Sequence, residues 1–233
     1  MSGENINRRR FLAGATITAA ATIIPRHVLG GAGNVAPSEK LNIAGIGVGG
    51  MGKSNLRQLE SENIVALCDV DHEYAAETFK RYPKAKVYTD FRKMLDKQKD
   101  IDAVMIATPD HTHAVIAAEA MRRRKHVYCQ KPLTHDVYES RMLAKMAKET
   151  GVTTQMGIQG HSMEGGRLIC EWIWDGVIGR VTEVDAWCSL SYYPFGHAWW
   201  SSKWSRRPKE TPPVPATLDW DLWLGPAPER PYH

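Results

Sequence analysis

Glycines recur in residues 45–52 at a spacing that could shape a tight backbone turn. They fit the pattern Gly-x-Gly-x-x-Gly in two registers, which begin at Gly45 and at Gly47. The second register is favoured because it leaves residues 41–46 intact as an apolar strand and begins a helix near Met51. A glycine-rich turn between a buried strand and a helix is typical of domains that bind dinucleotides. The sequence therefore predicts a nucleotide site at this turn.

Each glycine of the favoured register has a physical role in such a turn. Gly47 makes the turn, Gly49 lets the backbone approach a pyrophosphate, and Gly52 lets the helix pack closely on the strand. Asp69 lies 17 residues after Gly52, at the end of the next apolar run. Its carboxylate would accept hydrogen bonds from ribose hydroxyls and repel a 2′-phosphate, which favours NAD over NADP. The alternative is that Asp69 only caps a helix that begins near Asp71.

Lys131 follows another short apolar run, residues 126–129, within the motif Cys-Gln-Lys-Pro-Leu. A strand there would place the ammonium group at the carboxyl edge of a sheet, where open α/β folds bind their ligands. The ammonium could hydrogen-bond a substrate hydroxyl and favour alkoxide character as a hydride departs. The alternative is a lysine that faces solvent before a helix.

A third apolar run, residues 103–107, delivers residues 108–113 to the same edge. His111 and His113 raise the hypothesis of a metal site. They lie two residues apart on a turn that enters a helix, and no cysteine or carboxylate cluster accompanies them. Such a pair lacks the ligands of a usual metal site, so no metal is predicted.

Apolar runs and helical patterns alternate through this part of the chain, which predicts parallel strands joined by helices. The expected fold class is α/β, a Rossmann-type doubly wound parallel sheet followed by the start of a second α+β domain. The expected strands are residues 41–46, 64–68, 86–88, 103–107, 126–129, 152–156 and 180–187, and the expected helices are residues 50–59, 72–81, 91–97, 112–121, 134–150 and 163–175. Thr89 or Asp90 is expected to cap the helix of residues 91–97. Thr134 is expected to cap the start of the longest helix, residues 134–150, and Gly151 is expected to end it.

Residues 1–38 have the pattern of an export leader. Arg8 and Arg9 precede Phe11-Leu12, as in the twin-arginine signal, and an apolar run of residues 13–24 follows. That run is too short to cross the ~30 Å hydrocarbon core as a helix, so no stable membrane insertion is expected. The interpretation places the protein in the periplasm or elsewhere outside the cytoplasm. This route exports folded proteins, which suits a protein that must bind a cytoplasmic nucleotide before it leaves. The alternatives are a disordered basic terminus and an uncleaved anchor.

Composition excludes several classes of protein. The net charge is +4, but residues 1–37 contribute three of those charges, and no basic stripe for nucleic acid is present. The four cysteines form no Cys-x-x-Cys pair, which disfavours structural zinc. Cys68 and Cys129 end apolar runs, so they are interpreted as buried strand residues and not as reactive thiols.

Together these motifs resemble the Gfo/Idh/MocA family, which is named for glucose–fructose oxidoreductase and inositol dehydrogenase. The resemblance covers residues 41–187 and rests on the glycine loop, Asp69, residues 106–113 and Lys131 with the proline after it. The family signature at the last site is Glu-Lys-Pro, whereas this chain has Gln130. The sequence also looks like an exported subgroup of the family. It divides into a leader (1–38), an NAD(P)-binding Rossmann domain (39–158) and an incomplete second domain (159–233).

The resemblance implies an NAD-dependent oxidoreductase that passes a hydride between nicotinamide and a hydroxyl-bearing carbon of a sugar or cyclitol. It implies catalytic roles for Lys131 and His113 and substrate contacts by Lys131, Gln155, Gln159 and His161. Trp199, Trp200 and Trp204 could stack on a sugar face, although core or subunit packing is the plainer interpretation. The implied cofactor-binding residues are Gly47, Gly49, Gly50, Met51, Gly52, Asp69, Thr108, Pro109, His113, Gln130 and Lys131.

Two other functions fit the same residues. One is an NAD-dependent glycoside hydrolase that oxidises a sugar transiently, and the other is a non-catalytic nucleotide-binding protein, which Gln130 favours. Family members carry a further catalytic group in an Asp-x-x-x-His pattern of the C-terminal domain, and no such pattern follows residue 160. We therefore expect residues 39–233 to bind nucleotide without turning over substrate, and the full-length protein to form a homo-oligomer.

Overall fold

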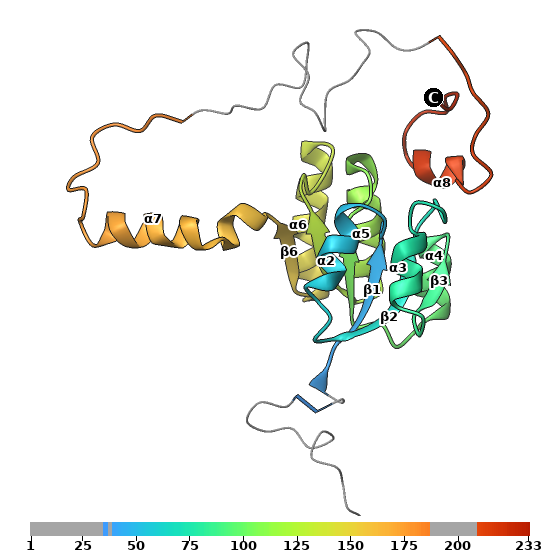
Figure 1. Ribbon diagram of the computed structural model, residues 1–233, viewed down its shortest axis with the longest axis horizontal. Coiled ribbons are helices and arrows are strands. Elements are labelled where there is room, and N and C mark those ends of the chain that lie inside the picture. Colours follow the sequence, from blue (N-terminus) through green and yellow to red (C-terminus); the bar gives the residue numbers. More distant parts are fainter. Residues whose placement is uncertain (1–34, 37–38, 187–208) are drawn as a thin grey trace, which may run out of the picture. The chain divides into compact units, whose positions relative to one another are not determined.

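A six-stranded parallel sheet lies at the centre of the described residues (Figure 1). The computed structural model describes residues 35–36, 39–186 and 209–233. The strands are β1 (Asn42–Ile46), β2 (Asn63–Cys68), β3 (Lys86–Tyr88), β4 (Ala103–Ile106), β5 (His126–Gln130) and β6 (Thr154–Gly157). Their order is β3-β2-β1-β4-β5-β6, and every neighbouring pair is parallel. This order confirms the predicted Rossmann-type sheet.

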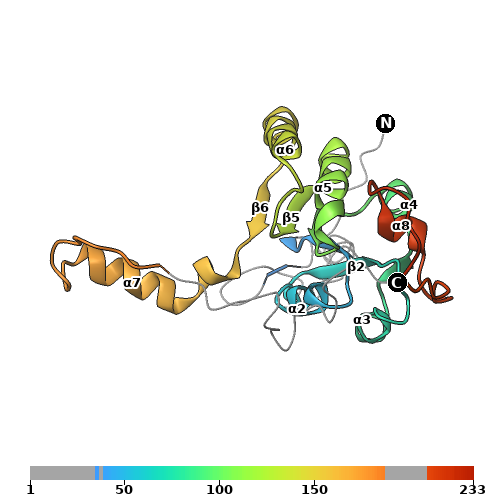
Figure 2. The ribbon, with the colours of Figure 1, turned by 90° about the horizontal axis from the view of Figure 1, so that it is seen from above.

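Helices cover both faces of the sheet (Figure 2). The helices are α2 (Met51–Arg57), α3 (Ala76–Arg81), α4 (Phe91–Lys97), α5 (His113–Arg122) and α6 (Val137–Thr150). Residues of α4, α5 and α6 pack on one face against Val104 and Ile106. Residues beside and within α2 pack on the other face, where Leu56 and Met105 are fully buried. Because successive strand residues point to opposite faces, the almost purely apolar β4 serves both layers.

Helix ends follow local chemistry. Asp90 caps α4 by accepting a hydrogen bond from the backbone N–H of Arg92 at 2.9 Å, as one of the two predictions stated. Gly151 ends α6 in the left-handed conformation, as predicted. The predicted cap Thr134 is wrong. Asp136 caps α6 instead, because its carboxylate accepts a hydrogen bond from the N–H of Glu139 at 2.8 Å.

Most predicted elements differ from the structure by no more than three residues at either end, and two differ further. Residues 72–75 form turns, because the carboxylate of Asp71 accepts hydrogen bonds from the N–H groups of Glu73 and Tyr74, and α3 begins only at Ala76. The strand expected at residues 180–187 is absent from its described part, residues 180–186. A strand needs a neighbour for its backbone hydrogen bonds, and no described segment pairs with this one.

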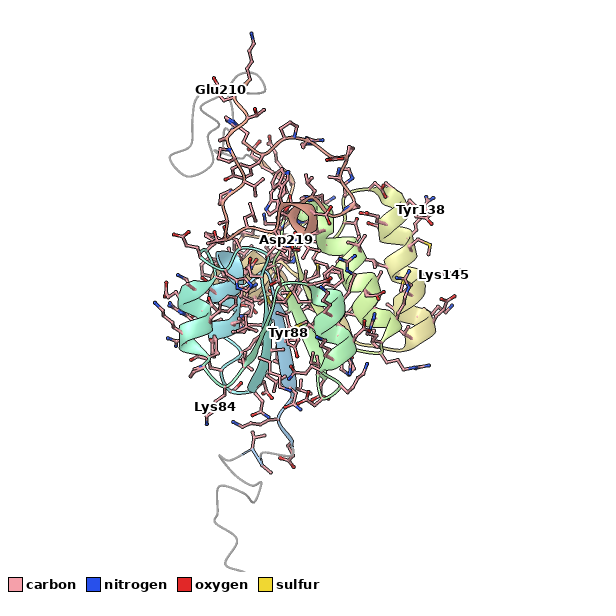
Figure 3. All side chains as sticks on the ribbon, turned by 90° about the vertical axis from the view of Figure 1, so that its right-hand side faces the viewer. Lys84, Tyr88, Tyr138, Lys145, Glu210 and Asp219 are labelled. Carbon is pink, nitrogen blue, oxygen red and sulfur yellow. The ribbon has the colours of Figure 1, made fainter. Side chains whose placement is uncertain are left out.

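Further helices follow β6. Helix α7 (Glu164–Trp174) confirms the helix expected near residues 163–175, and none of its residues is buried. Helix α8 (Trp220–Leu224) was not predicted. No helix of the described ranges is long and apolar enough to cross a membrane. Figure 3 shows Tyr138 and Lys145 on the outer side of α6. The predicted leader motif and Trp199, Trp200 and Trp204 lie outside the described residues.

Candidate functional site

The glycine loop packs backbone against backbone at the end of β4. Gly47 has a φ of +75°, and a Cβ atom there would lie 2.6 Å from the backbone nitrogen of Thr108. A Cβ atom on Gly52 would lie 1.8 Å from the carbonyl oxygen of Gly47. Only glycine fits at these two positions, because the opposing atoms belong to the main chain. The bounds of β1 and α2 match the second of the two predicted registers.

Asp69 is bound to the loop that it was predicted to serve. One carboxylate oxygen accepts hydrogen bonds from the N–H groups of Val48 and Gly49, at 2.7 and 3.2 Å, and the other accepts one from Asp71 at 3.0 Å. Burial raises the pKa of Asp69, and these three hydrogen bonds oppose the rise. A carboxylate has about four acceptor sites, so one further hydrogen bond from a ligand hydroxyl can be accepted.

His113 connects two strand ends. Its ring is buried, with Nδ1 2.6 Å from the carbonyl oxygen of Pro132 and Nε2 2.8 Å from that of Thr108. Both ring nitrogens therefore face main-chain acceptors in the segments that follow β4 and β5. This geometry favours a positioning role for His113 over the predicted catalytic role.

Lys131 and Gln130 differ in their surroundings. Lys131 is exposed, and its ammonium has no partner among the described residues. Gln130 ends β5 and is buried, and its Nε2 donor has no hydrogen-bond partner in the described part of the chain. Buried donors nearly always have an acceptor. A ligand acceptor at the end of β5 would satisfy this one.

Three of the four residues predicted to contact substrate do not gather at the glycine loop. Gln155 lies within β6, as the predicted strand of residues 152–156 implies, and its Nε2 donates to the carbonyl oxygen of Met156. Gln155 and Gln159 line an apolar groove of about 370 Å³ on the sheet, which shares no residue with the clefts at Asp69. His161 is exposed in a 3₁₀ turn.

A cleft of about 330 Å³ lies beside the glycine loop and includes residues that the sequence reasoning missed. Gly49, Asp69, Thr108 and Pro109 line it together with Tyr74 and with residues from the C-terminal part of the chain: Leu218, Trp220, Trp223, Tyr232 and His233. The ring of Tyr74 lies on the loop, since a Cβ atom on Gly49 would come within 2.1 Å of it. The sequence shows aromatic residues after the Rossmann strands, but it does not show which segment of the chain they pack against.

The described residues contain no group of three or more histidine, cysteine or acidic side chains arranged to hold a metal ion. His111 has a different contact, because its Nε2 lies 3.0 Å from the carbonyl oxygen of Trp223. The two histidines of the metal hypothesis thus both face main-chain oxygens.

Comparison with known proteins matches the same region. The model of an oxidoreductase family with an NAD-binding Rossmann fold, Gfo/Idh/MocA, matches residues 41–158. Levoglucosan dehydrogenase of Pseudarthrobacter phenanthrenivorans is 30% identical over 156 residues, which cover 61% of this chain and 39% of that protein. Alpha-N-acetylgalactosaminidase of Shewanella oneidensis is 32% identical over 211 residues, which cover 78% of this chain and 46% of that protein.

A solved structure has the same fold. The crystal structure of myo-inositol 2-dehydrogenase from Lactobacillus plantarum is similar with a TM-score of 0.57 and 27% identity, and the match covers 61% of this chain and 43% of that one. The chain spans less than half the length of each of these relatives.

Proposed function

Because the chain belongs to the Gfo/Idh/MocA oxidoreductase family, we propose that the protein is an NAD-dependent oxidoreductase that acts on a hydroxyl-bearing carbon of a sugar or cyclitol. The observation that carries the proposal is the pairing of the glycine loop with Asp69. No side chain fits at Gly47 or Gly52 of the loop. The carboxylate of Asp69 lies beside the loop and can accept a further hydrogen bond.

The residues present fit a dinucleotide. Gly47 makes the turn and Gly52 lets α2 pack closely on it, so the main chain of the loop would bind a pyrophosphate, and Asp69 would hold the ribose hydroxyls. The carboxylate would repel a 2′-phosphate, so we propose NAD as the cofactor and not NADP. The orphaned donor of Gln130 would face the same edge of the sheet.

When bound, nicotinamide accepts or donates the hydride. Lys131 would bind the substrate hydroxyl through its ammonium and favour alkoxide character on that oxygen. His113 would hold the main chain of Pro132 next to Lys131, and so position the ammonium. We also propose substrate contacts by Gln155, Gln159 and His161, which lie within and after β6.

A second candidate is an NAD-dependent glycoside hydrolase. It is supported by the similarity to alpha-N-acetylgalactosaminidase of Shewanella oneidensis, which covers more of this chain than the similarity to levoglucosan dehydrogenase. Transient oxidation of the sugar would allow elimination of the leaving alcohol. Water would then add to the resulting double bond, and return of the hydride to the sugar would regenerate NAD.

We also propose a separate role for each region of the chain. Residues 39–158 would bind the cofactor, and residues 159–233 would begin a domain that contacts substrate and other subunits. The twin-arginine motif supports export of residues after 38 to the periplasm. Assembly into a homo-oligomer is proposed for the full-length protein.

The test measures NADH formation and sugar release by the purified protein with sugars, cyclitols and glycosides. NADH in proportion to oxidised sugar supports the dehydrogenase, and glycoside cleavage without net NADH supports the hydrolase. Lys131→Met should abolish either activity, while Lys145→Met on the outer side of α6 should not. Residues 39–233 alone are expected to bind dinucleotide without turnover, so a non-catalytic binding protein would be favoured by binding with neither activity in the protein that includes a C-terminal catalytic domain. Turnover by residues 39–233 alone would show that the acid–base group lies within them.

A further inference from the structure

The chain after residue 216 adds to the Rossmann domain next to Asp69. The N–H of His72 donates to the carbonyl oxygen of Thr217 at 3.1 Å, and the N–H of Asp219 donates to the carbonyl oxygen of Val70 at 2.8 Å. Leu218 lies between these bonds in an antiparallel bridge with Asp71. We call residues 217–232 the strap. Its main chain is fixed within three residues of the predicted ribose carboxylate.

The strap holds its aromatic side chains in one cluster. Asp219 caps α8 by accepting a hydrogen bond from the N–H of Leu222 at 3.1 Å. Trp220 and Trp223 stack with ring centres 4.8 Å apart, and Tyr232 meets Trp220 edge-on at 5.2 Å. The indole N–H of Trp220 donates to the carbonyl oxygen of Arg230. The cluster is therefore built from both ends of the strap. Figure 3 labels Asp219 at the start of α8.

Trp223 is fixed against the Rossmann domain. The carbonyl oxygen of Trp223 lies 3.0 Å from Nε2 of His111, and its indole ring lies 5.2 Å from the imidazole. Gly225 lies close to Thr112, since a Cβ atom on it would come within 3.1 Å of the threonine methyl group. The strap therefore contacts the turn that follows β4 as well as the turn that follows β2.

Two clefts lie between the strap and the strand ends, and Trp223 lines both. The larger cleft, of about 330 Å³, has the glycine loop, Asp69 and Thr108 on one side and the strap aromatics on the other. The smaller cavity, of about 60 Å³, reaches inward to Cys68 and Phe91. The larger cleft therefore offers more room for a ligand at the strap than the smaller cavity does.

The order of these contacts indicates which part of a ligand the strap would meet. The glycine loop serves the pyrophosphate and Asp69 the adenosine ribose, so the group beyond the ribose is the adenine base. Flat bases stack on aromatic side chains, and each such contact contributes measurably to affinity. We propose that the strap is a wall of the nucleotide site and that Trp223 contacts the adenosine half of the dinucleotide. The inference rests on the proposed cofactor and not on the proposed substrate.

The test titrates the whole chain with NAD, ADP-ribose and nicotinamide mononucleotide by calorimetry. Trp223→Ala should weaken the binding of NAD and of ADP-ribose by the same factor, about ten-fold. Trp223→Phe should keep most of the affinity, because a ring remains. Trp172→Ala is the matched control, since Trp172 lies on α7 and lines neither cleft. Binding of nicotinamide mononucleotide should not change in any variant.

Equal affinities of the parent and Trp223→Ala for ADP-ribose would overturn the inference. Tighter binding of ADP-ribose by Trp223→Ala would also overturn it, because the strap would then block the nucleotide site instead of lining it. If Trp223→Ala does not fold, the test is the tryptophan fluorescence of the parent and of Trp223→Phe during titration with ADP-ribose. The inference predicts that ADP-ribose changes the emission of the parent and changes the emission of Trp223→Phe less. A parent that binds ADP-ribose more tightly than Trp223→Ala supports the strap inference whether or not it oxidises a sugar, so the inference is tested independently of the proposed substrate. A parent that binds no dinucleotide overturns both.

Discussion

The buried imidazole of His113 lies 2.6 Å from the carbonyl oxygen of Pro132, the residue that follows Lys131. Its other nitrogen lies 2.8 Å from the carbonyl oxygen of Thr108, at the end of β4. One side chain at the start of α5 thus connects the two turns that carry the proposed cofactor and substrate contacts. We propose that this connection positions Lys131.

His113→Ala should destabilise the domain. Leaving a buried carbonyl without a donor costs roughly 1–3 kcal/mol, and the ring also fills space in the core. We expect a loss of at least about 2 kcal/mol in the free energy of unfolding, measured with urea. His161→Ala, at an exposed position, should leave the free energy of unfolding unchanged. Equal stabilities of the two variants would contradict this account of His113.

Gly47→Ala should disrupt both folding and nucleotide binding. The residue has a positive φ, and the new Cβ atom would lie 2.6–2.7 Å from the main chain of Thr108 and Ala107. A non-glycine residue in this conformation costs about 1–3 kcal/mol before any clash is counted. Thermal unfolding and NAD titration measure the two effects.

Gly160→Ala is the matched control for Gly47→Ala, because a Cβ atom on Gly160 would meet nothing within 4 Å. It should unfold at the parent temperature. A Gly47→Ala chain as stable as the parent would show that the loop is looser than described.

The cysteines should differ in reactivity. Burial raises the pKa of the Cys129 thiol to about 12, and burial also raises that of Cys68, with the nearby Asp69 adding to the effect. Cys170 is exposed on α7. Since the thiolate is the reactive form, a chain with Cys170→Ser and Cys188→Ser should take up almost no maleimide at neutral pH until it is unfolded. Rapid labelling of that folded chain would contradict the burial of Cys68 and Cys129.

The proposed leader predicts export by the twin-arginine route. Replacing Arg8 and Arg9 together by lysine should retain the protein in the cytoplasm, because the motif requires the arginine pair. Cell fractionation measures this, with Arg26→Lys as the control. Unchanged export of the double variant would rule out the twin-arginine interpretation.

Local patterns predicted most of the Rossmann domain because they depend on neighbours in the chain. Asp90 marks the start of α4 and Gly151 marks the end of α6, and each does so through contacts with residues a few positions away in the chain. The strap could not be predicted, since it depends on hydrogen bonds between residues 70–72 and 217–219, and the sequence of residues 188–216, just before the second segment, has no regular pattern. The position of His113 was predicted, but its role depends on two carbonyl groups that the fold brings to it.

Asp69 should make nucleotide binding depend on pH. Its pKa in the folded chain is raised by burial, so the protonated carboxyl favours the folded state, and this contribution to stability is lost as the pH rises through the raised pKa. Binding of ribose hydroxyls has the opposite dependence, because the ionised carboxylate is the better acceptor. NAD affinity should therefore fall as the pH is lowered through the raised pKa, and calorimetry across pH measures it.

The most direct test of the central claim is calorimetric titration of the chain with NAD and with NADP, repeated on Asp69→Ala. Losing a hydrogen bond to a charged group costs about 1.5–3 kcal/mol. The account predicts tighter binding of NAD than of NADP, a roughly ten- to hundred-fold loss of NAD affinity in the variant, and a narrower gap between the two nucleotides. Asp175→Ala, at an exposed residue after α7, should bind NAD as the parent does. Tighter binding of NADP than of NAD by the parent, or unchanged NAD affinity in Asp69→Ala, would contradict it.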